Sequence, residues 1–210
     1  MVPAIVSQAA TVAAGDHAGV IEYRVRQIGQ VDGGPIHQHD DISIAVVTDG
    51  DKVVRVRVFS YVQDGAQQSD AAKAQVQSQL ENGTERFANP FDVRSFADYS
   101  FSVDGSTVHF VSLKRDADHG DGWFQVDATG HVTKMTYTPD VMPKYVSSAT
   151  VTLQRGAVLP GFWATTSSVT SFKGHYLFIH GGATFTTLQS TFRRFNDRKA
   201  ALADLASLQE

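Results

Sequence analysis

The fold is decided by the stretch Ile42-Ser-Ile-Ala-Val-Val-Thr-Asp-Gly-Asp-Lys-Val-Val-Arg-Val-Arg-Val58, where apolar and polar residues alternate on both sides of an Asp-Gly pair. Alternation with a period of two is typical of a half-buried β-strand, because successive side chains point to opposite faces. An Asp-Gly pair between two such runs favours a tight hairpin turn, since glycine accepts a positive φ. The stretch therefore predicts two antiparallel strands. In the second, Val54, Val56 and Val58 share the apolar face, and Arg55 and Arg57 share the polar one.

The same pattern extends outward from this hairpin in both directions. Before it, residues 20–28 alternate in the same way, with Tyr23 and Val25 on one face. After residue 97 a series of short β-like runs follows, separated by Asp104-Gly105 and by a turn ending at Gly130. We place these strands near 98–103, 106–114, 122–127, 131–138, 146–154, 162–172, 174–181 and 184–194. With the first three, the total is about eleven.

Helical patterns interrupt the strands in two places. Residues 64–83 are rich in Ala and Gln, with Ser69 placed to cap a helix and Gly83 placed to end it. The apolar stripe of this helix is thin, consisting of Ala72, Val76 and Leu80. Residues 84–98, with Phe87, Phe91 and Phe96, indicate an aromatic loop or short helix against the same surface. A short C-terminal helix is predicted after Asn196, which we expect to be its cap, with Leu202, Leu205 and Leu208 three residues apart.

Many antiparallel strands in sequence cannot form a flat sheet, because each adds roughly 20–25° of twist and large open sheets curl. The sequence therefore predicts a mainly β (α+β) protein. Its single curved antiparallel sheet forms an unclosed β-barrel of about eleven strands, with a helix covering the concave face and a short C-terminal helix. We expect one domain over residues 19–210, preceded by an extended N-terminal segment over residues 1–18.

Composition excludes several classes of function. The chain of 210 residues has 22 acidic and 18 basic side chains, a net charge of -4, so the basic patch of a general nucleic-acid-binding protein is not expected. Cysteine is absent, which removes thiol catalysis and disulfides. No run approaches the ~20 apolar residues of a membrane-spanning helix, and the first ten residues lack the pattern of a secretory signal. The common motifs of hydrolases, nucleotide-binding proteins and metalloproteases are missing, so we expect a non-catalytic protein without a cofactor.

Three polar clusters nevertheless deserve a functional hypothesis. In an extended chain, His37 and His39 would lie on one side about 6.5–7 Å apart, which suits two metal ligands, with Asp40 and Asp41 beside them. The alternative is a polar hairpin loop. A second cluster could hold calcium, and a third could meet a phosphate head group, although a solvated turn or face explains each as well. These two clusters consist of Asp116, Asp118 and Asp121, and of Arg193, Arg194, Arg198 and Lys199.

The concave face offers a different hypothesis. A curved sheet with one thin helix has difficulty filling its concave side, and an unfilled apolar cavity is suited to a lipid or acyl chain. Residues at every second position of a strand share one face, and we use this rule to choose the residues expected to line such a cavity. For each of them, ordinary core packing is the competing interpretation. These residues are Tyr23, Val25, Ile44, Val46, Val56, Val58, Phe110, Phe124, Met135 and Tyr137.

Three segments carry a resemblance to a known family. They are Gly122-Trp-Phe-Gln-Val-Asp-Ala-Thr-Gly-His-Val132, Leu159-Pro-Gly-Phe-Trp163 and Pro90-Phe-Asp-Val-Arg-Ser-Phe96. Together with the order of strands and helix over most of residues 19–195, they resemble the LolA/LppX-like superfamily of periplasmic lipoprotein-carrier proteins, which includes outer-membrane lipoprotein-sorting proteins. The resemblance implies an unclosed antiparallel β-barrel, helices against its concave face, and a hydrophobic cavity for acyl chains. The chain departs from the pattern in lacking a lipobox cysteine and in having fewer apolar helices.

Three functional hypotheses follow. The leading one is a non-catalytic periplasmic carrier that shields the acyl chain of a lipid or lipoprotein in the half-barrel and releases it when a covering helix moves. The second is a ligand-free protein-interaction domain of the cell envelope. The third is a metal-dependent hydrolase centred on His37 and His39. The oligomeric state, the cargo and the partner proteins do not follow from the sequence.

Overall fold

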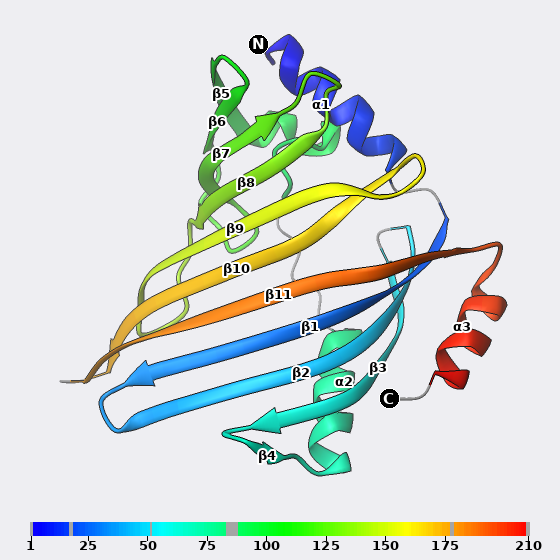
Figure 1. Cartoon of the computed structure of the whole chain (residues 1–210). Helices are drawn as coiled ribbons and strands as arrows, with labels where there is room; N and C mark the ends of the chain where they lie inside the picture. The colour runs from blue at the N-terminus through cyan, green and yellow to red at the C-terminus, as the bar shows by residue number, and fades with distance from the viewer. Residues whose placement is uncertain (1, 17–18, 51, 83–87, 177–178, 209–210) are drawn as a thin grey trace.

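The computed structural model describes residues 2–16, 19–50, 52–82, 88–176 and 179–208. Within these residues, eleven antiparallel strands form one curved, unclosed sheet with the order β4-β3-β2-β1-β11-β10-β9-β8-β7-β6-β5 (Figure 1), which confirms the predicted fold class. The strands are β1 (Val20–Gly33), β2 (Ile36–Asp49), β3 (Lys52–Gln63), β4 (Ala66–Gln67), β5 (Tyr99–Asp104), β6 (Thr107–Ser112), β7 (Gly120–Val126), β8 (Val132–Pro139), β9 (Val146–Leu159), β10 (Phe162–Tyr176) and β11 (Ile179–Phe195).

Tight turns join most neighbouring strands, as the sequence predicts. The glycines at three predicted turns all have a positive φ, namely Gly50 at +59°, Gly105 at +56° and Gly130 at +92°. One pairing is not sequential, because β1 pairs with β11 along almost its whole length. This long ladder joins the first three strands to the later ones. The two margins of the sheet are consequently β4 with the free part of β3 on one side and β5 on the other.

The predicted strand over residues 174–181 is wrong. Residues 174–176 belong to the end of β10 and residues 179–181 to the beginning of β11, and these two strands pair with each other from Ser167 to Tyr176; residues 177 and 178 lie outside the described residues. The two-residue strand β4, which we did not predict, keeps the total at eleven. The error arises because β10 and β11 have 15 and 17 residues, far above the usual five or six, so the paired ends of two long strands resemble a short strand of their own.

Helix α2 (Asp70–Asn82) lies beside β3 and begins directly after its predicted cap, Ser69. Ser69 accepts a hydrogen bond from the backbone N–H of Ala72 at 3.3 Å, the expected capping contact. The predicted helix began too early, since residues 64–67 form a turn and β4, and Gly83 lies outside the described residues. Helix α3 (Arg198–Ser207) is capped by Asp197, whose carboxylate accepts the N–H of Ala200 at 2.8 Å, and not by Asn196 as predicted.

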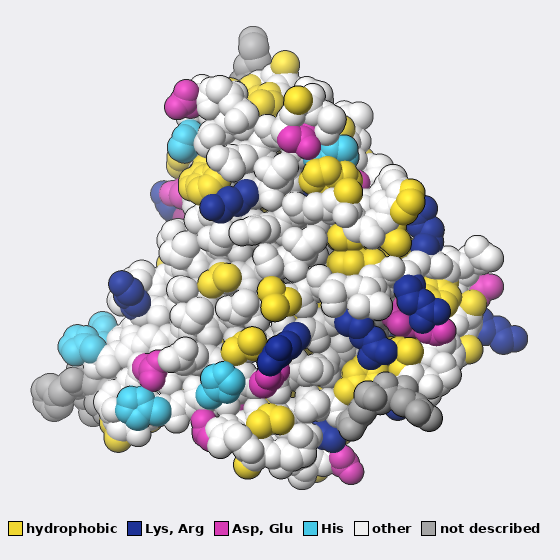
Figure 2. Space-filling view, in the orientation of Figure 1, with side chains coloured by type: hydrophobic (Ala, Val, Ile, Leu, Met, Phe, Trp, Pro, Cys, Tyr) yellow, Lys and Arg dark blue, Asp and Glu magenta, His cyan; other side chains and the backbone are white. Residues whose placement is uncertain are grey.

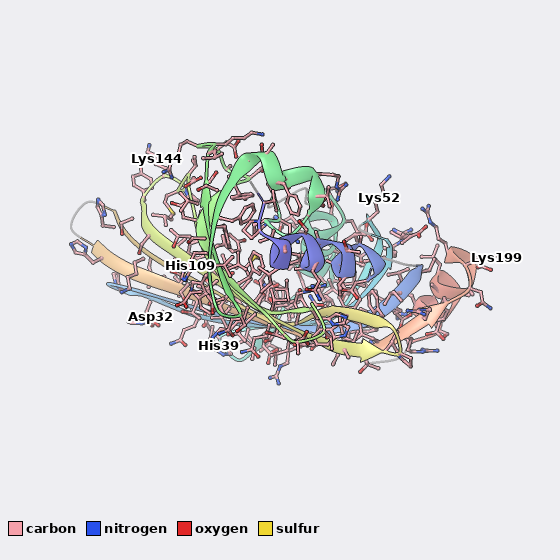
Figure 3. All side chains as sticks on the ribbon, turned by 90° about the horizontal axis from the view of Figure 1, so that it is seen from above. Asp32, His39, Lys52, His109, Lys144 and Lys199 are labelled. Carbon is pink, nitrogen blue, oxygen red and sulfur yellow. The ribbon has the colours of Figure 1, made fainter. Side chains whose placement is uncertain are left out.

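The expectation of an extended N-terminal segment is wrong. Residues Ala4–Gly15 form helix α1, whose buried side chains are Val6, Ala9, Ala10 and Ala13. Alanine has the highest helix propensity, and its small side chain lets a helix lie close against a sheet. Helix α1 and the 3₁₀ helix η1 (Val93–Asp98) lie on one side of the curved sheet, the concave side (Figure 3). The concave face is therefore covered by α1 as well as by α2.

Three buried clusters show how the two faces are used. On the concave face, one cluster lies between α1 and strands β5–β8 and is centred on Phe110 and Phe124. A second concave cluster joins β1, β2 and β3 to Leu80 of α2. The third lies on the opposite face, where Ala201 and Leu205 of α3 pack on Ala45 and Val47. Val54 joins this third cluster, so the prediction that it shares a face with Val56 and Val58 is wrong. A register shift between Val47 and Thr48 in the β2–β3 ladder explains the change of face.

The hairpin of β7 and β8 carries the first of the three resemblance segments, and one of its glycines is sterically required. A Cβ added to Gly122 would lie 2.1 Å from the carbonyl oxygen of Thr136 on the neighbouring strand. Gly122 therefore allows β7 and β8 to approach closely beside the fully buried Phe124. No helix among the described residues is long and apolar enough to cross a membrane.

Candidate functional site

A cavity of about 420 Å³ lies on the concave face, between the two clusters covered by α1 and α2. Its lining combines apolar and polar residues, which come from β1, β2, β3, β8, β9, β10, β11, the β2–β3 turn, the end of α1 and the segment before η1. The apolar lining residues are Ile21, Tyr23, Val53, Phe91, Met135, Leu153, Phe162, Trp163, Ala164 and Phe192. The volume falls within the ~300–1,000 Å³ of typical small-molecule sites.

Cross-strand pairing builds the two walls of the cavity. On one side, Met135 of β8 pairs directly with Leu153 of β9, and both line the cavity. On the other side, the rings of Tyr23 and Phe192 stack with their centroids 5.3 Å apart. Burial raises the pKa of Tyr23, so its phenol is neutral at physiological pH. Both walls therefore present uncharged, apolar surface.

Between these walls, Ala164 and Thr165 of β10 and Gln189 of β11 line the cavity. Farther along the middle strands, Ser168 of β10 pairs with Leu153 on one side and Thr187 of β11 on the other. Directly opposed residues share a face, so Ser168 and Thr187 continue the concave row that Leu153 begins, beyond the residues that line the cavity.

Phe162 and Trp163 both line the cavity although they are consecutive in a strand. A register shift lies between them in the β9–β10 ladder, and such a shift re-aims one side chain relative to the next. The ring of His131, in the β7–β8 turn, stacks on Trp163 with a centroid separation of 4.1 Å and an interplanar angle of 15°. Phe162 and Trp163, the last two residues of the segment Leu159–Trp163 on which the family resemblance partly rests, thus lie at one end of the cavity.

A buried ion pair stands at the same end. Arg155 donates from Nη2 to Oδ2 of Asp16 at 3.3 Å and to the carbonyl oxygen of Trp163, also at 3.3 Å. The other carboxylate oxygen of Asp16 accepts the backbone N–H of Trp163 at 3.1 Å. The side chains of Arg155 and Asp16 are only 9% and 5% exposed, and burial lowers the pKa of Arg155 while Asp16 opposes that effect. Asp16 follows the end of α1, so this pair ties α1 to the β9–β10 hairpin.

The segment that crosses the cavity is anchored at Ala88. Its N–H donates to the carbonyl of Asp118 at 2.6 Å, and its carbonyl accepts the hydroxyl of Tyr99 at 2.5 Å. The next residues, Asn89 and Phe91, line the cavity, and the ring of Phe91 packs edge-on against Phe124. The position of this covering segment therefore depends on the loop that contains Asp118.

That loop is held by a buried histidine. His119 is 5% exposed, and its ring nitrogens contact Asp116 at 2.5 Å and Asp98 at 3.3 Å. Burial by itself lowers the pKa of His119, but its hydrogen bonds to the two carboxylates outweigh burial and raise it. In the protonated form both nitrogens donate, and the imidazolium then joins the loop to the end of η1.

This arrangement predicts a pH dependence of stability. Because the pKa of His119 is raised on folding, its contribution to the free energy of unfolding is complete below its unfolded pKa, ~6.5, and is lost as the pH rises through the folded value. We expect the difference in free energy of unfolding between wild type and His119→Gln to shrink at alkaline pH, as measured by urea denaturation across a pH series. A difference that is constant with pH would contradict the charged bridge. His109→Gln, a substitution at an exposed position, serves as the control.

All the predicted lining residues lie in the two concave clusters. Tyr23, Val25, Ile44, Val46, Val56 and Val58 belong to the α2-covered cluster, and Phe110, Phe124, Met135 and Tyr137 to the α1-covered one. Of these, Tyr23 and Met135 border the cavity. The others form the packed flanks, and a contact between them and a ligand stays a prediction. Phe87, expected in the covering segment, lies outside the described residues.

Sequence reasoning missed the cavity residues that come from turns and strand ends. Phe162 and Trp163 had a signal, since they belong to a segment quoted for the resemblance. Asp16 and Arg155 had none, because their pairing joins residues far apart in the chain, after α1 and within β9. Phe192 was missed because the register of β11 shifts against β1 between Glu22 and Arg24.

The histidine pair lies away from this cavity. His37 and His39 are part of strand β2 and not of a loop, and Nδ1 of His37 contacts Asp32 at 3.0 Å. Asp32 and His39 lie on the side of the sheet opposite α1 (Figure 3), and histidines gather on that face near the β1–β2 and β10–β11 hairpins (Figure 2). Within the described residues, no group of three or more His, Asp or Glu side chains is arranged to hold a metal ion.

The other two polar clusters have protein partners. Asp116 binds His119, and Asp121 accepts the backbone N–H of Ser112 at 2.8 Å, so the two carboxylates face different groups. Near the C-terminus, Arg193 pairs with Asp204 at 2.5 Å and Arg198 with Asp49 at 2.5 Å. These ion pairs attach α3 to the ends of β2 and β11.

The sequence matches no protein-family model and no curated protein. Solved structures similar to this chain include an outer membrane lipoprotein-sorting protein domain from Vibrio parahaemolyticus, with 12% identity, a TM-score of 0.47, and coverage of 95% of this chain and 97% of that one. A DUF1329 family protein from Desulfovibrio piger has 11% identity, a TM-score of 0.43 and coverage of 98% of both chains. Lipovitellin, with 11% identity and a TM-score of 0.44, is matched over 87% of this chain, which spans only 26% of that one. The first of these structures is a protein of the kind that the sequence resembles.

Proposed function

We propose that the concave cavity binds an acyl chain of a lipid or lipoprotein, and that the protein is a non-catalytic carrier of that chain in the periplasm. The observation that supports the proposal is the cavity itself, bounded by stacked or paired apolar side chains from β1, β8, β9 and β11. Each buried methylene of a fatty chain contributes roughly 0.8 kcal/mol, so several methylenes along these walls give useful affinity without any covalent chemistry.

A carrier must also release its cargo. The segment with Asn89 and Phe91 belongs to the part of the cavity lining that lies outside the strands, together with Asp16 and Gly50. Among the described residues, Ala88 in this segment makes two backbone hydrogen bonds, to Asp118 and to Tyr99. Displacing this segment exposes the cavity while the sheet keeps its ladders. Loading and release in this proposal therefore occur by movement of residues 88–92 together with α1.

The test is a substitution that fills the cavity. Ala164 lines the cavity, so Ala164→Trp places an indole where the acyl chain would lie. We expect wild type to bind a fluorescent fatty acid, and the variant to bind it at least about tenfold more weakly, because the loss of two methylene contacts already costs this factor. Native mass spectrometry of the purified protein provides the second measurement, through a co-purifying lipid.

The matched control is Gln154→Trp on the neighbouring strand β9, where the side chain is exposed and does not line the cavity. It should bind as wild type does, and circular dichroism should show that both variants are folded. A wild-type protein that carries no lipid and ignores fatty acids would overturn the proposal, and so would equal binding by the two variants.

A further inference from the structure

The cavity has a charged end as well as apolar walls. Among the described residues that line it, Arg155 is the only basic side chain and Asp16 the only acidic one. Arg155 lies over the ring of Phe91, with its guanidinium carbon 5.4 Å from the ring centroid. The guanidinium therefore stands between the covering segment and the Leu159–Trp163 turn, beside the apolar space.

Some N–H donors of the Arg155 guanidinium have no protein acceptor among the described residues. Its hydrogen bonds to protein within the described residues all come from Nη2, which serves both Asp16 and the carbonyl of Trp163. Nε and Nη1 have no acceptor in this part of the chain, although the side chain is only 9% exposed. A buried guanidinium is normally satisfied on all sides, and its fork matches the two oxygens of a carboxylate or phosphate.

Asp16 does not use up this capacity. One of its oxygens accepts the Trp163 N–H and the other accepts a single N–H of Arg155 at 3.3 Å, a longer contact than a paired carboxylate and guanidinium usually form. Asp16 therefore fixes the position of Arg155 through one nitrogen and leaves the opposite edge of the fork available.

We infer that the cavity selects a single-chain amphiphile with an oxyanion head, whose head group binds Nε and Nη1 of Arg155 while its chain lies along Tyr23 and Leu153. The inference rests on the proposed acyl-chain function and adds the class of head group. A buried hydrogen bond to a charged group contributes more than a neutral one, so the head group should decide between ligands with identical chains.

The experiment compares three ligands with the same sixteen-carbon chain: palmitate, hexadecyl phosphate and hexadecanol. Binding to the full chain is measured by displacement of a fluorescent fatty acid at about pH 8, where a carboxylic acid is ionised. We expect the two anions to bind about 10- to 100-fold more tightly than the alcohol, which corresponds to a hydrogen-bonded charge pair. A preference for one anion over the other identifies which oxyanion the site accepts.

The decisive variant is Asp16→Asn combined with Arg155→Gln, which removes both charges and leaves no buried ion unpaired. It should bind all three ligands as weakly as wild type binds hexadecanol, whereas Arg198→Gln, at an exposed arginine on α3, should keep the preference. If the double variant does not fold, Arg155→Lys keeps the charge without the fork, and it should weaken palmitate binding while hexadecanol binding is unchanged.

The remaining outcomes separate the two proposals. Equal binding of the three ligands to wild type overturns the head-group inference and leaves the acyl-chain function intact. An anion preference that survives in the double variant also overturns it, because the selectivity would then come from another group. Failure of all three ligands to bind overturns the acyl-chain function, and the inference with it.

Discussion

Replacing Phe124 with alanine should lower the free energy of unfolding by about 3–5 kcal/mol, the usual cost of removing a buried phenylalanine. Phe124 is fully buried, and its ring contacts Phe91 edge-on at 5.6 Å and Phe110 at 6.1 Å between centroids. The backbone at Gly122, two residues before it, already touches β8, so the strands cannot collapse further to fill the space. Most of the cavity left by the substitution should therefore persist.

The measurement is urea denaturation of wild type and variant with the slope held in common. Leu113→Ala provides the control, since Leu113 is 65% exposed and its truncation should change stability by less than about 0.5 kcal/mol. Phe124→Ala should also weaken acyl binding, because Phe91, which rests on Phe124, covers the cavity. A loss of stability below about 1 kcal/mol would show that the packing of the α1-covered cluster around Phe124 adds little to the stability of the fold.

Removing Asp16 alone should have a comparable effect, for an electrostatic reason. In Asp16→Ala, the buried Arg155 loses its counter-ion and the Trp163 N–H loses its acceptor. Breaking a buried ion pair by removing one partner typically costs about 3–5 kcal/mol, most of it the penalty of leaving a charge unpaired.

The double substitution Asp16→Asn and Arg155→Gln is the matched control for this prediction. Because it removes both charges, it should be markedly more stable than Asp16→Ala, and a double-mutant cycle gives the coupling between the two sites. Equal stability of the single and double variants would show that solvent already reaches the guanidinium. Protection of α1 amides from hydrogen exchange should fall in Asp16→Ala, since the tie to the β9–β10 hairpin is lost.

The sequence contains enough information for the sheet and its turns. Alternation in residues 42–58 and glycines at Gly50, Gly105 and Gly130 determine strands and turns locally, and the structure confirms them. Helix α1 was missed because its buried stripe consists mainly of alanine, which carries little apolar contrast. Long strands such as β10 and β11 were divided for a related reason, since Ser, Thr and Gly inside them resemble turn residues.

The sequence predicts on which face of the sheet the candidate site lies, but it does not predict where on that face the cavity is. The alternation of side chains along a strand assigns Tyr23 and Met135 to the concave side correctly, because this alternation depends only on neighbours within one strand. The location of the cavity depends on which residues of neighbouring strands lie opposite one another, and that follows from the register of the strands. Register shifts at Phe162 and Glu22 then bring in residues that simple alternation assigns to the wrong side.

The open margins at β4 and β5 have a mechanical meaning. In a closed barrel, strand number and stagger together set the diameter, so the interior cannot widen without breaking backbone hydrogen bonds. Here a degree or two of extra twist at each of ten ladders adds up across the sheet and spreads its free borders, with every ladder intact. The concave face can thus adjust its width to ligands of different thickness at little energetic cost.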